Sequence, residues 1–388
     1  MIVIVGAGQA AAQLVLSLRQ GGYKKPIRMM GDEVYAPYQR PPLSKKFLTE
    51  RPPADTLYFR PGKFWAEQGV TADYGVPVES IDRASKRVNF RSGQAKYDIL
   101  FLSTGTRARP LSVPGANLPG VYSLRKIDDV RALRAPMDAA KHIVIVGGGY
   151  IGLEVAAVAR GEGREVTVLE AEERVMKRVT SPVISTFMQD FHNSRGVDIR
   201  LGAQLAAIEG QGKVEQVRLA DGGLLAADLV LLAVGAKPND DLAAAAGLTC
   251  EDGVLVDEHG CTAAPDIYAA GDCTRFPSRR YGRKLRLECV QNAIDQAKAV
   301  AGTILGKPQI YDPVPWFWSD QYELKLQMAG LSEGYDDAQT VGDVAATRFS
   351  VEYRKNGKLI AVDAVNDGRA YMSGRKRIAE ETSVSHAQ

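Results

Sequence analysis

The stretch IVIVGAGQAAAQLVLSLRQGG, residues 2–22, decides the fold of the N-terminal part of the chain. Its first four residues form an apolar run of strand length, which leads directly into a glycine-rich turn and an alanine- and leucine-rich helical segment. Gly6 permits a tight turn, Gly8 lets the backbone approach a pyrophosphate, and Ala11 is small enough for the helix to pack on the strand. This order of elements predicts a Rossmann-like dinucleotide-binding fold.

An acidic residue is expected about twenty residues after such a glycine turn, where it holds a ribose. Asp32 and Glu33 occupy that place, after the expected strand Ile27–Met30. The N-terminus of the helix offers unpaired N–H groups and a partial positive charge to phosphates. Strand, helix and acid therefore agree on a nucleotide site.

A second segment, IVIVGGGYIGLEVAAVARGEGREVTVLE at residues 143–170, repeats this architecture. The expected strand Ile143–Val146 leads into Gly147-x-Gly149-x-x-Gly152 and then into a helix. Two such folds in one chain predict that two dinucleotides are bound.

The expected strand Glu165–Leu169 ends on Glu170. A carboxylate at this strand end accepts hydrogen bonds from the 2′- and 3′-hydroxyls of an adenine ribose but repels a 2′-phosphate. Arg174 and Arg178 are the nearby basic residues that would oppose it. The second fold is therefore expected to prefer NADH over NADPH.

Three further apolar runs each end on a small-residue turn. They are YDILFLSTG, which ends on Thr104 and Gly105, DLVLLAVG, which ends on Gly235, and DIYAAGD, which ends on Gly271 and Asp272. With the two glycine motifs, this set resembles the two-dinucleotide flavoprotein superfamily related to glutathione reductase. The resemblance implies FAD in the first fold, NAD(P)H in the second, and a hydrogen bond from Asp272 to the ribityl chain of the flavin.

Members of that superfamily that reduce disulfides or peroxides carry a reactive cysteine in the stretch after the first acidic turn. Here that stretch is YAPYQRPPLSKKFL, residues 35–48, and it contains no cysteine, which excludes thiol chemistry. The same stretch, with PWFWSDQYELKLQMAG at 315–330 and LSEGYD at 331–336, resembles the oxygenase-coupled NADH–ferredoxin reductases of the putidaredoxin reductase type.

This resemblance implies hydride transfer from NADH to FAD, then one-electron transfers to a two-iron two-sulfur ferredoxin that feeds an oxygenase. The implied FAD contacts are Gly6, Gly8, Ala10, Ala11, Asp32, Arg40, Lys45, Val78, Thr104, Gly105, Arg125, Gly271, Asp272, Val290 and Trp316. The implied NADH contacts are Gly147, Gly149, Tyr150, Ile151, Gly152, Glu170 and Gly235.

Three residues are candidates for catalysis. Lys45 would add positive charge near the reduced flavin, alongside the N-terminus of the expected helix Val290–Leu305; the alternative is a solvated surface lysine. Glu154 would either support the nicotinamide region or make an ordinary salt bridge. Trp316 and Trp318 alternate in an extended segment and so share one side of it, and Trp316 is expected near the flavin ring.

Two rival functions stay open. An NADH oxidase would pass electrons to oxygen directly, although most of that branch carries the missing cysteine. A redox-linked binding protein resembling apoptosis-inducing factor would not be an enzyme. Rates with a ferredoxin, compared with rates with oxygen alone, distinguish the three possibilities.

The partner ferredoxins of this class are generally acidic, so a basic face near the flavin is expected. The segment RFPSRRYGRKLR, residues 275–286, carries six basic residues and no acid; the alternative is a solvated loop. The candidate docking residues are Arg275, Arg279, Arg280, Arg283, Lys284, Arg286, Lys298 and Arg375, with Lys376 and Arg377 beside the last.

Composition agrees with a globular protein of several domains. The chain has 388 residues, 45% apolar and 24% charged, with a formal net charge of +3, which argues against wholesale nucleic-acid binding. No apolar run approaches the ~20 residues of a membrane helix. Met1–Val5 has neither a basic start nor a cleavage site, so no signal peptide is expected and the cytoplasm is the default location.

Cysteine and histidine give no sign of a metal site or a redox dithiol. The cysteines are at least eleven residues apart, and no histidine stands in a metal-ligand spacing. They are Cys250, Cys261, Cys273 and Cys289, with His142, His192, His259 and His386.

The predicted fold class is α/β, with two Rossmann-like domains and a C-terminal α+β domain. Residues 1–112 and 246–309 are expected to bind FAD, residues 113–245 NADH, and residues 310–388 to form the C-terminal domain.

Two local predictions concern strands. The segments Val76–Ile81, Arg87–Phe90 and Tyr97–Leu102 are expected to form a small β-layer of the FAD domain. In the C-terminal domain, the strand-like runs Ala346–Tyr353 and Lys358–Val365 flank an Asn-Gly pair that predicts a tight hairpin.

Overall fold

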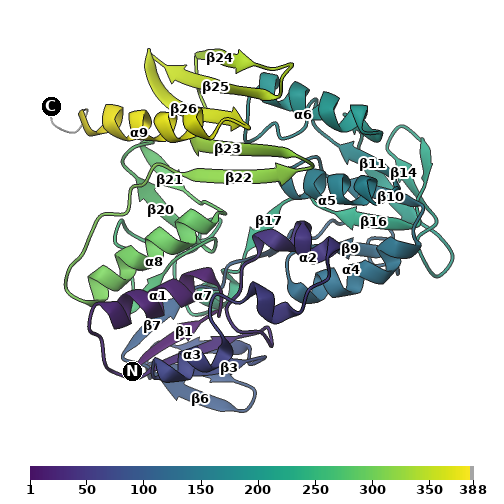
Figure 1. The fold of residues 1–388 in the computed structure, drawn as a ribbon. Coiled ribbons are helices and arrows are strands. Elements are labelled where there is room, and N and C mark those ends of the chain that lie inside the picture. Colours follow the sequence, from purple (N-terminus) through teal and green to yellow (C-terminus); the bar gives the residue numbers. More distant parts are fainter. Residues whose placement is uncertain (385–388) are drawn as a thin grey trace. The chain divides into compact units, whose positions relative to one another are not determined.

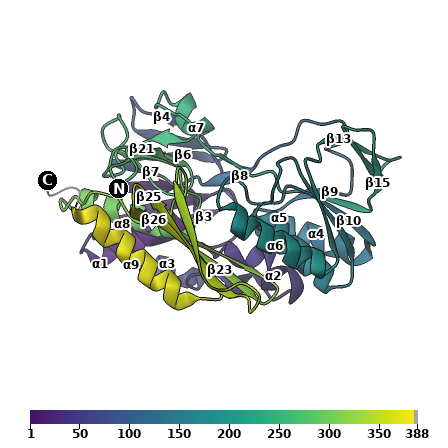
Figure 2. The same cartoon turned by 90° about the horizontal axis from the view of Figure 1, so that it is seen from above.

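The computed structural model describes residues 1–384 (Figures 1 and 2). The chain divides into two compact units. The first unit comprises Met1–Gln39, Pro53–Arg107 and Lys237–Pro315; the second comprises Arg40–Pro52, Ala108–Ala236 and the chain from Trp316 onward. Two short strands, β8 (Thr106–Ala108) and β17 (Ala236–Pro238), pair where the chain passes between the units. None of the helices within residues 1–384 is long and apolar enough to cross a membrane.

A five-stranded parallel sheet forms the centre of the first unit, with strand order β3-β2-β1-β7-β19. β1 is buried along its whole length, as expected for a parallel strand covered on both faces. The strands of this sheet and the helices of the unit are β1 (Ile2–Val5), α1 (Gln9–Gln20), β2 (Ile27–Gly31), α3 (Gly62–Glu67), β3 (Val70–Tyr74), β7 (Ile99–Leu102), α7 (Asp241–Ala245), β19 (Ile267–Ala269) and α8 (Val290–Ile304).

Helices α1 and α8 lie side by side over this sheet (Figure 1). Leu14 and Leu18 of α1 share one hydrophobic core with Ala297 and Val300 of α8, and all four side chains are buried. The small residues of both helices allow this close packing. As a result, the N-termini of α1 and α8 lie in the same layer of the unit.

The small β-layer of the first unit differs from the prediction in its third strand. It consists of β4 (Val78–Asp82), β5 (Arg87–Phe90) and β6 (Gly93–Lys96), which pair antiparallel. The segment Tyr97–Leu102 instead supplies β7 of the central sheet, where it pairs with β1. Leu100, Phe101 and Leu102 are buried on both faces of the strand, a pattern that suits a central parallel strand and not a half-exposed layer.

The basic segment after Gly271 forms strands. β20 (Thr274–Ser278) and β21 (Arg283–Leu285) pair antiparallel, and β18 (Val254–Leu255) joins β20 as a parallel neighbour. The segment is therefore a hairpin of paired strands and not a loop.

The second unit contains a parallel sheet with strand order β12-β11-β10-β16-β9, and an antiparallel sheet β13-β14-β15 beside it. Its elements are a 3₁₀ turn at Pro41–Ser44, α2 (Lys46–Thr49), β9 (Val121–Ser123), α4 (Ile127–Ala139), β10 (His142–Val146), α5 (Tyr150–Gly161), β11 (Glu165–Glu170), α6 (Pro182–Ser194), β12 (Val197–Leu201), β13 (Leu205–Glu209), β14 (Gln216–Leu219), β15 (Leu224–Ala226) and β16 (Leu229–Leu232).

The grouping of Arg40–Pro52 with the second unit has a local cause. Arg134 of α4 donates a hydrogen bond to the carbonyl of Phe47 and stacks its guanidinium 4.5 Å from the Phe47 ring centroid. The sequence-based boundaries, which place this segment in the FAD domain of residues 1–112, stay a prediction.

The chain from Trp316 onward forms an antiparallel sheet of strand order β22-β23-β26-β25-β24, covered by one long helix that lies along β26 and β23 (Figure 2). The predicted hairpin is confirmed: Lys355 pairs with Lys358, and Asn356 and Gly357 have φ of 50° and 76°. Positive φ at both positions is the type I′ geometry that Asn-Gly favours. The elements are β22 (Trp316–Gln321), β23 (Leu324–Gly330), β24 (Asp337–Asp343), β25 (Arg348–Lys355), β26 (Lys358–Val365) and α9 (Gly368–Val384).

This sheet shares a hydrophobic core with the helices of the second Rossmann-like fold. Leu153 of α5 and Met188 of α6 are fully buried in a cluster that includes Leu326 and Phe349 of the antiparallel sheet. The C-terminal sheet is therefore packed directly against the helix that follows the second glycine turn.

A buried carboxylate lies beside that core. Asp363 of β26 accepts hydrogen bonds from the hydroxyls of Thr180 and Tyr353, and the Tyr353 hydroxyl also lies 2.9 Å from Ser181 Oγ. Burial raises the pKa of Asp363 to about 6, and the two hydroxyl donors oppose that rise. Because the folded protein binds this proton more tightly than the unfolded chain, Asp363 lowers the free energy of unfolding as the pH rises from about 4 to about 6.

We therefore expect Asp363→Asn to stabilise the protein relative to the wild type by an amount that grows between pH 4 and 6 and is constant above. The plateau should be roughly 2–3 kcal/mol. Melting temperatures of both proteins across pH 4–8 measure the difference. Asp337→Asn, an exposed carboxylate of the same sheet, should give a flat difference. A flat profile for Asp363→Asn as well would contradict the assignment.

Candidate functional site

The first glycine turn needs its glycine for a steric reason. Gly6 has φ of +102°, and a Cβ on it would lie 2.2 Å from the carbonyl oxygen of Ser103. Gly8 precedes α1 and has no atom within 4 Å of a Cβ position, and no side chain caps the helix. The first N–H groups of α1 are thus left for an anion, as in pyrophosphate sites.

The third of the small-residue turns lies beside this one. A Cβ on Gly271 would lie 3.4 Å from Cβ of Ala10 and 3.9 Å from Cβ of Ala293, the fourth residue of α8. The structure therefore brings Ala10, Gly271 and the start of α8 together, and Asp272 and Val290 are part of these segments.

Gln296 holds this turn in place and was missed by the sequence reasoning. Its Oε1 accepts hydrogen bonds of 2.8 Å from the backbone N–H of Gly271 and from Oγ1 of Thr274. The side chain is 1% exposed. The available signal was a glutamine within an alanine-rich helix face.

The first of the small-residue turns, at Thr104 and Gly105, is held by hydrogen bonds to Asn239. Nδ2 of Asn239 donates to the carbonyl of Thr104 at 2.8 Å, and the backbone N–H of Asn239 donates to the carbonyl of Gly105. In return, Oγ1 of Thr104 donates to the Asn239 carbonyl at 2.6 Å. Asn239 is not among the residues that the sequence predicts for the site. Val78, another predicted contact, begins β4 in the separate antiparallel sheet.

The second unit repeats the glycine geometry. Gly147 has φ of +110°, and a Cβ on it would lie 2.5 Å from the Ala233 carbonyl oxygen. A Cβ on Gly152 would lie 2.1 Å from the Gly147 carbonyl oxygen, so α5 can approach the turn only without a side chain there. α5 begins at Tyr150 after Gly149 with no side-chain cap. Ile151 is 39% exposed at this helix start.

Glu170 closes the second turn. Its Oε2 accepts a 2.8 Å hydrogen bond from the N–H of Gly148, and its Oε1 accepts one of 3.0 Å from the N–H of Glu172. Each carboxylate oxygen has a second lone pair available for a ligand hydroxyl.

The two folds differ at this position. In the first, the N–H of Gly6 donates to the carbonyl of Met30, and in the second the N–H of Gly147 donates to the carbonyl of Leu169. This equivalence puts Gly31 where the second fold has Glu170. The acid of the first fold therefore comes from the segment after β2, where Asp32 is exposed.

The basic residues near Glu170 have other partners. Arg174 donates to the carbonyls of Thr180 and Lys177 and to Oγ of Ser185. Arg178 is directed elsewhere, with one guanidinium nitrogen 3.6 Å from a Cβ position on Gly235. Arg174 and Arg178 are thus directed away from the Glu170 carboxylate, whose negative charge is available at the strand end.

Lys45 and Glu154 form an ion pair, with Nζ 2.7 Å from Oε2. The Glu154 side chain is 5% exposed and that of Lys45 is 20% exposed, so Lys45 is not the solvated surface lysine of the alternative interpretation. Ser44 also donates to Oε2, and Ser319 of β22 donates to Oε1 at 2.7 Å.

The tryptophans lie on β22. The ring centroids of Trp316 and Trp318 are 5.8 Å apart, which agrees with their predicted position on one side of an extended segment. The guanidinium of Arg375 lies 5.4 Å from the Trp316 ring centroid. Arg40 donates a 2.9 Å hydrogen bond to the carbonyl of Arg125, so these two predicted contacts are neighbours.

The thiols are free and unreactive in character. Burial raises the pKa of Cys250 and Cys261 to about 11 and that of Cys289 to about 12. Within residues 1–384 no group of His, Cys, Asp and Glu is arranged to hold a metal ion, and His386 lies outside the described residues. Thiolate chemistry at neutral pH is therefore not supported by these side chains.

Comparison with known proteins identifies the class. The pattern of the family described as "Pyridine nucleotide-disulphide oxidoreductase" matches residues 1–297, and the pattern described as "Reductase C-terminal" matches residues 316–388. The chain belongs to the pyridine nucleotide-disulphide oxidoreductase family.

Within this family, the chain is similar to reductases along its whole length. It is 42% identical to rhodocoxin reductase of Rhodococcus erythropolis over 100% of this chain and 91% of the relative. It is 40% identical to putidaredoxin reductase of Pseudomonas putida over 99% and 92%. A solved covalent complex of putidaredoxin reductase with putidaredoxin matches with a TM-score of 0.94, 40% identity, and coverage of 98% and 93%.

FAD and NAD(H) are the cofactors that this family implies, and the residues fit them. Each Rossmann-like fold has a glycine turn with open space at its second glycine, Gly8 or Gly149, and an uncapped helix start behind it. A dinucleotide pyrophosphate requires both features.

We expect Gly152→Ala to weaken NAD⁺ binding by about 5- to 100-fold, because the new Cβ must push α5 away from the turn. The FAD content should not change. Calorimetric titration with NAD⁺ measures the effect. Gly161→Ala is the matched control, since it lies on the same helix with nothing within 4 Å. Wild-type affinity in Gly152→Ala would show that the turn does not hold the nucleotide.

Proposed function

We infer that the protein is an FAD-dependent NADH:ferredoxin oxidoreductase, which passes electrons from NADH to a small two-iron two-sulfur ferredoxin. The observation that carries this inference is the match over 98% of the chain to a reductase solved in complex with its electron acceptor, putidaredoxin. The two uncapped glycine turns supply the sites for both dinucleotides within one chain.

FAD, when bound, accepts a hydride and releases electrons one at a time. The protein therefore has to bind the cofactor, orient it toward the nicotinamide and tune its electronic properties. We propose that the N–H groups at the start of α1 bind the FAD pyrophosphate and that Asp272 binds the ribityl chain. The N-terminus of α8, a fifteen-residue helix, would add a fixed partial positive charge, and Lys45 a full one. Trp316 would cover the ring.

Glu170 is proposed to select the nicotinamide cofactor. Its carboxylate is already oriented by the N–H groups of Gly148 and Glu172, so it can accept from ribose hydroxyls without reorganising. The 2′-phosphate of NADPH would be repelled by this negative charge. NADH is therefore the expected donor.

We propose that residues 1–112 and 246–309 form the FAD domain, residues 113–245 the NADH domain and residues 310–388 the C-terminal domain. We propose a cytoplasmic location, because four free thiols suit a reducing compartment. An oxygenase would receive the electrons from the ferredoxin.

The test is to purify the protein with its flavin and to add stoichiometric NADH without oxygen. The flavin absorbance should bleach with NADH and much more slowly with NADPH, and a two-iron two-sulfur ferredoxin should then be reduced far faster than oxygen. Oxygen as the better acceptor would favour an NADH oxidase. Failure to reduce either acceptor would favour a redox-linked binding protein.

We propose that the ferredoxin docks near the hairpin of β20 and β21. This hairpin follows Asp272 and leads into α8, both of which are proposed to contact FAD. Its six basic residues would attract an acidic partner.

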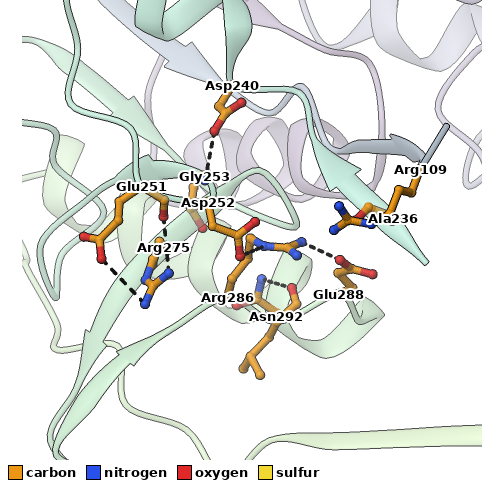
Figure 3. Close-up of polar contacts among 12 residues, drawn as sticks. Arg109, Ala236, Asp240, Glu251, Asp252, Gly253, Arg275, Arg286, Glu288 and Asn292 are labelled. Atoms are coloured by element: carbon orange, nitrogen blue, oxygen red, sulfur yellow. Dashed lines mark hydrogen bonds and ion pairs between the residues drawn. The ribbon is translucent and has the colours of Figure 1, made fainter. Parts of the chain in front are cut away.

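The charge of this surface is smaller than the sequence suggested. Figure 3 shows Arg275 beside Glu251, and Arg286 between Asp252 and Glu288. Elsewhere on the surface, Arg279 pairs with Glu258 and Lys284 with Glu251, and Lys298 pairs with Asp295 of its own helix. Asp312 adds another acid, since its carboxylate accepts hydrogen bonds from the Ser278 hydroxyl and from the backbone N–H of Arg280. Because acids offset most of the basic side chains, we expect moderate electrostatic steering.

We expect ferredoxin reduction to slow as salt rises, because the Debye length shrinks from about 10 Å at 0.1 M to about 3 Å at 1 M. The double variant Arg279→Glu/Arg283→Glu should raise the ferredoxin KM and leave ferricyanide reduction nearly unchanged. Lys63→Glu/Arg91→Glu changes the net charge equally at exposed positions of the same unit and should have little effect. Equal loss in both double variants would mean that docking occurs elsewhere.

A further inference from the structure

A chain of buried polar side chains runs through the second unit and ends on Glu154. Its members come from α5, β22 and α6: Glu154, Ser319, Gln321 and His192. The exposed fractions are 5%, 0%, 1% and 0% in that order. The large majority of polar groups this deeply buried are hydrogen-bonded, so each contact matters.

Every link of the chain has hydrogen-bond length. Oγ of Ser319 lies 2.7 Å from Oε1 of Glu154, and Nε2 of Gln321 lies 3.0 Å from Oγ of Ser319. Nε2 of His192 lies 2.8 Å from Oε1 of Gln321. Ser319 and Gln321 are two residues apart on one strand, and so point to the same face of it.

The carboxylate at one end determines the direction of every proton. A carboxylate accepts only, so the single hydroxyl proton of Ser319 must go to Glu154. Ser319 must then accept from the amide nitrogen of Gln321, which turns the amide oxygen toward His192. His192 must therefore carry its proton on Nε2.

The far end of the chain agrees with this direction. Nδ1 of His192 is buried and has no hydrogen-bond partner among the described residues, as expected for the bare acceptor nitrogen of a neutral imidazole. Burial lowers the pKa of His192, which keeps the ring neutral near pH 7. The chain is thus a one-way series of donors directed at Glu154, and aligned bonds of this kind strengthen one another.

We propose that Ser319, supported by Gln321 and His192, is a positioning residue that fixes the Glu154 carboxylate, and through it the Lys45 ammonium, for hydride transfer from NADH. The inference rests on the proposed function. It gives the C-terminal sheet a part in the NADH step, because Ser319 and Gln321 belong to β22 while Glu154 belongs to the helix after the second glycine turn.

The simpler alternative is that these groups only satisfy one another inside a packed core. The two explanations differ in how mutations combine. If Ser319 acts through Glu154, losing its hydroxyl should matter only while the carboxylate is present, whereas a general packing role would persist without it.

The main experiment measures anaerobic flavin reduction by NADH in a rapid-mixing instrument. Ser319→Ala should slow reduction by about tenfold, since it removes a hydrogen bond to a charged group. In the Glu154→Gln background, the same change should have little further effect. Ser350→Ala is the matched control, because Ser350 is 2% exposed in the same antiparallel sheet, where it pairs with Ala364, while Glu154 is held by Ser44, Lys45 and Ser319.

A second variant, at Gln321, keeps the side-chain volume and replaces the amide nitrogen, which donates to Ser319, with an acceptor oxygen. Gln321→Glu presents a second carboxylate to Ser319, so that two acceptors compete for one hydroxyl proton, and reduction should slow at least as much as in Ser319→Ala. This variant also covers the case in which Ser319→Ala does not fold.

An independent readout needs no turnover. In protein labelled with ¹⁵N-histidine, the His192 ring should show a protonated Nε2 and a bare Nδ1, and the Nε2 resonance should shift in Ser319→Ala but not in Ser350→Ala. A His192 protonated on Nδ1 would overturn the proposal.

The kinetic outcomes separate two failures. If wild-type flavin is not reduced by NADH, the proposed function is wrong. If wild-type flavin is reduced but Ser319→Ala keeps the wild-type rate, or slows Glu154→Gln as much as it slows the wild type, only the positioning role is overturned.

Discussion

In each Rossmann-like fold, a carbonyl oxygen lies where the side chain of the first glycine would begin. The oxygen belongs to Ser103 opposite Gly6 and to Ala233 opposite Gly147, at 2.2 and 2.5 Å from the Cβ positions. This contact sets how closely the strand, the turn and the neighbouring strand can approach. Because no side chain fits there, the helix that follows starts next to the end of its sheet, with its N–H groups free for a phosphate. The nucleotide sites depend on this single steric constraint.

The second unit adds a polar constraint to the steric one. Glu154 lies one turn into α5, where it is buried and would be unfavourable without partners. Those partners come from two distant parts of the sequence, Ser44 and Lys45 before the helix and Ser319 long after it. The antiparallel C-terminal sheet is therefore more than a cover for the second fold, since its first strand completes the surroundings of a charged group beside the proposed NADH site.

Charge on the hairpin of β20 and β21 shows why local composition can mislead. Six basic residues in twelve suggest a strongly positive surface, but the acids that pair with them lie outside that segment, at Glu251, Asp252, Glu258 and Glu288. A weak and brief encounter between electron-transfer partners is compatible with a small excess of charge. The same hairpin also explains why this segment is ordered, because paired strands and ion pairs replace a solvated loop.

The sequence by itself determined the two nucleotide folds, the absence of a reactive cysteine near the first, the acid at the end of β11 and the Asn-Gly hairpin. These features depend on residues close together in the chain, where backbone geometry and side-chain size act directly. Only the tertiary structure decided that Tyr97–Leu102 joins the central sheet and that Glu170 has no counterpart on β2. It also decided that Gln296 and Asn239 hydrogen-bond two turns of the first unit and that Ser319 donates to Glu154. Each of these depends on which distant segments meet, and hydrogen bonds between side chains far apart in the chain leave no periodic pattern in the sequence.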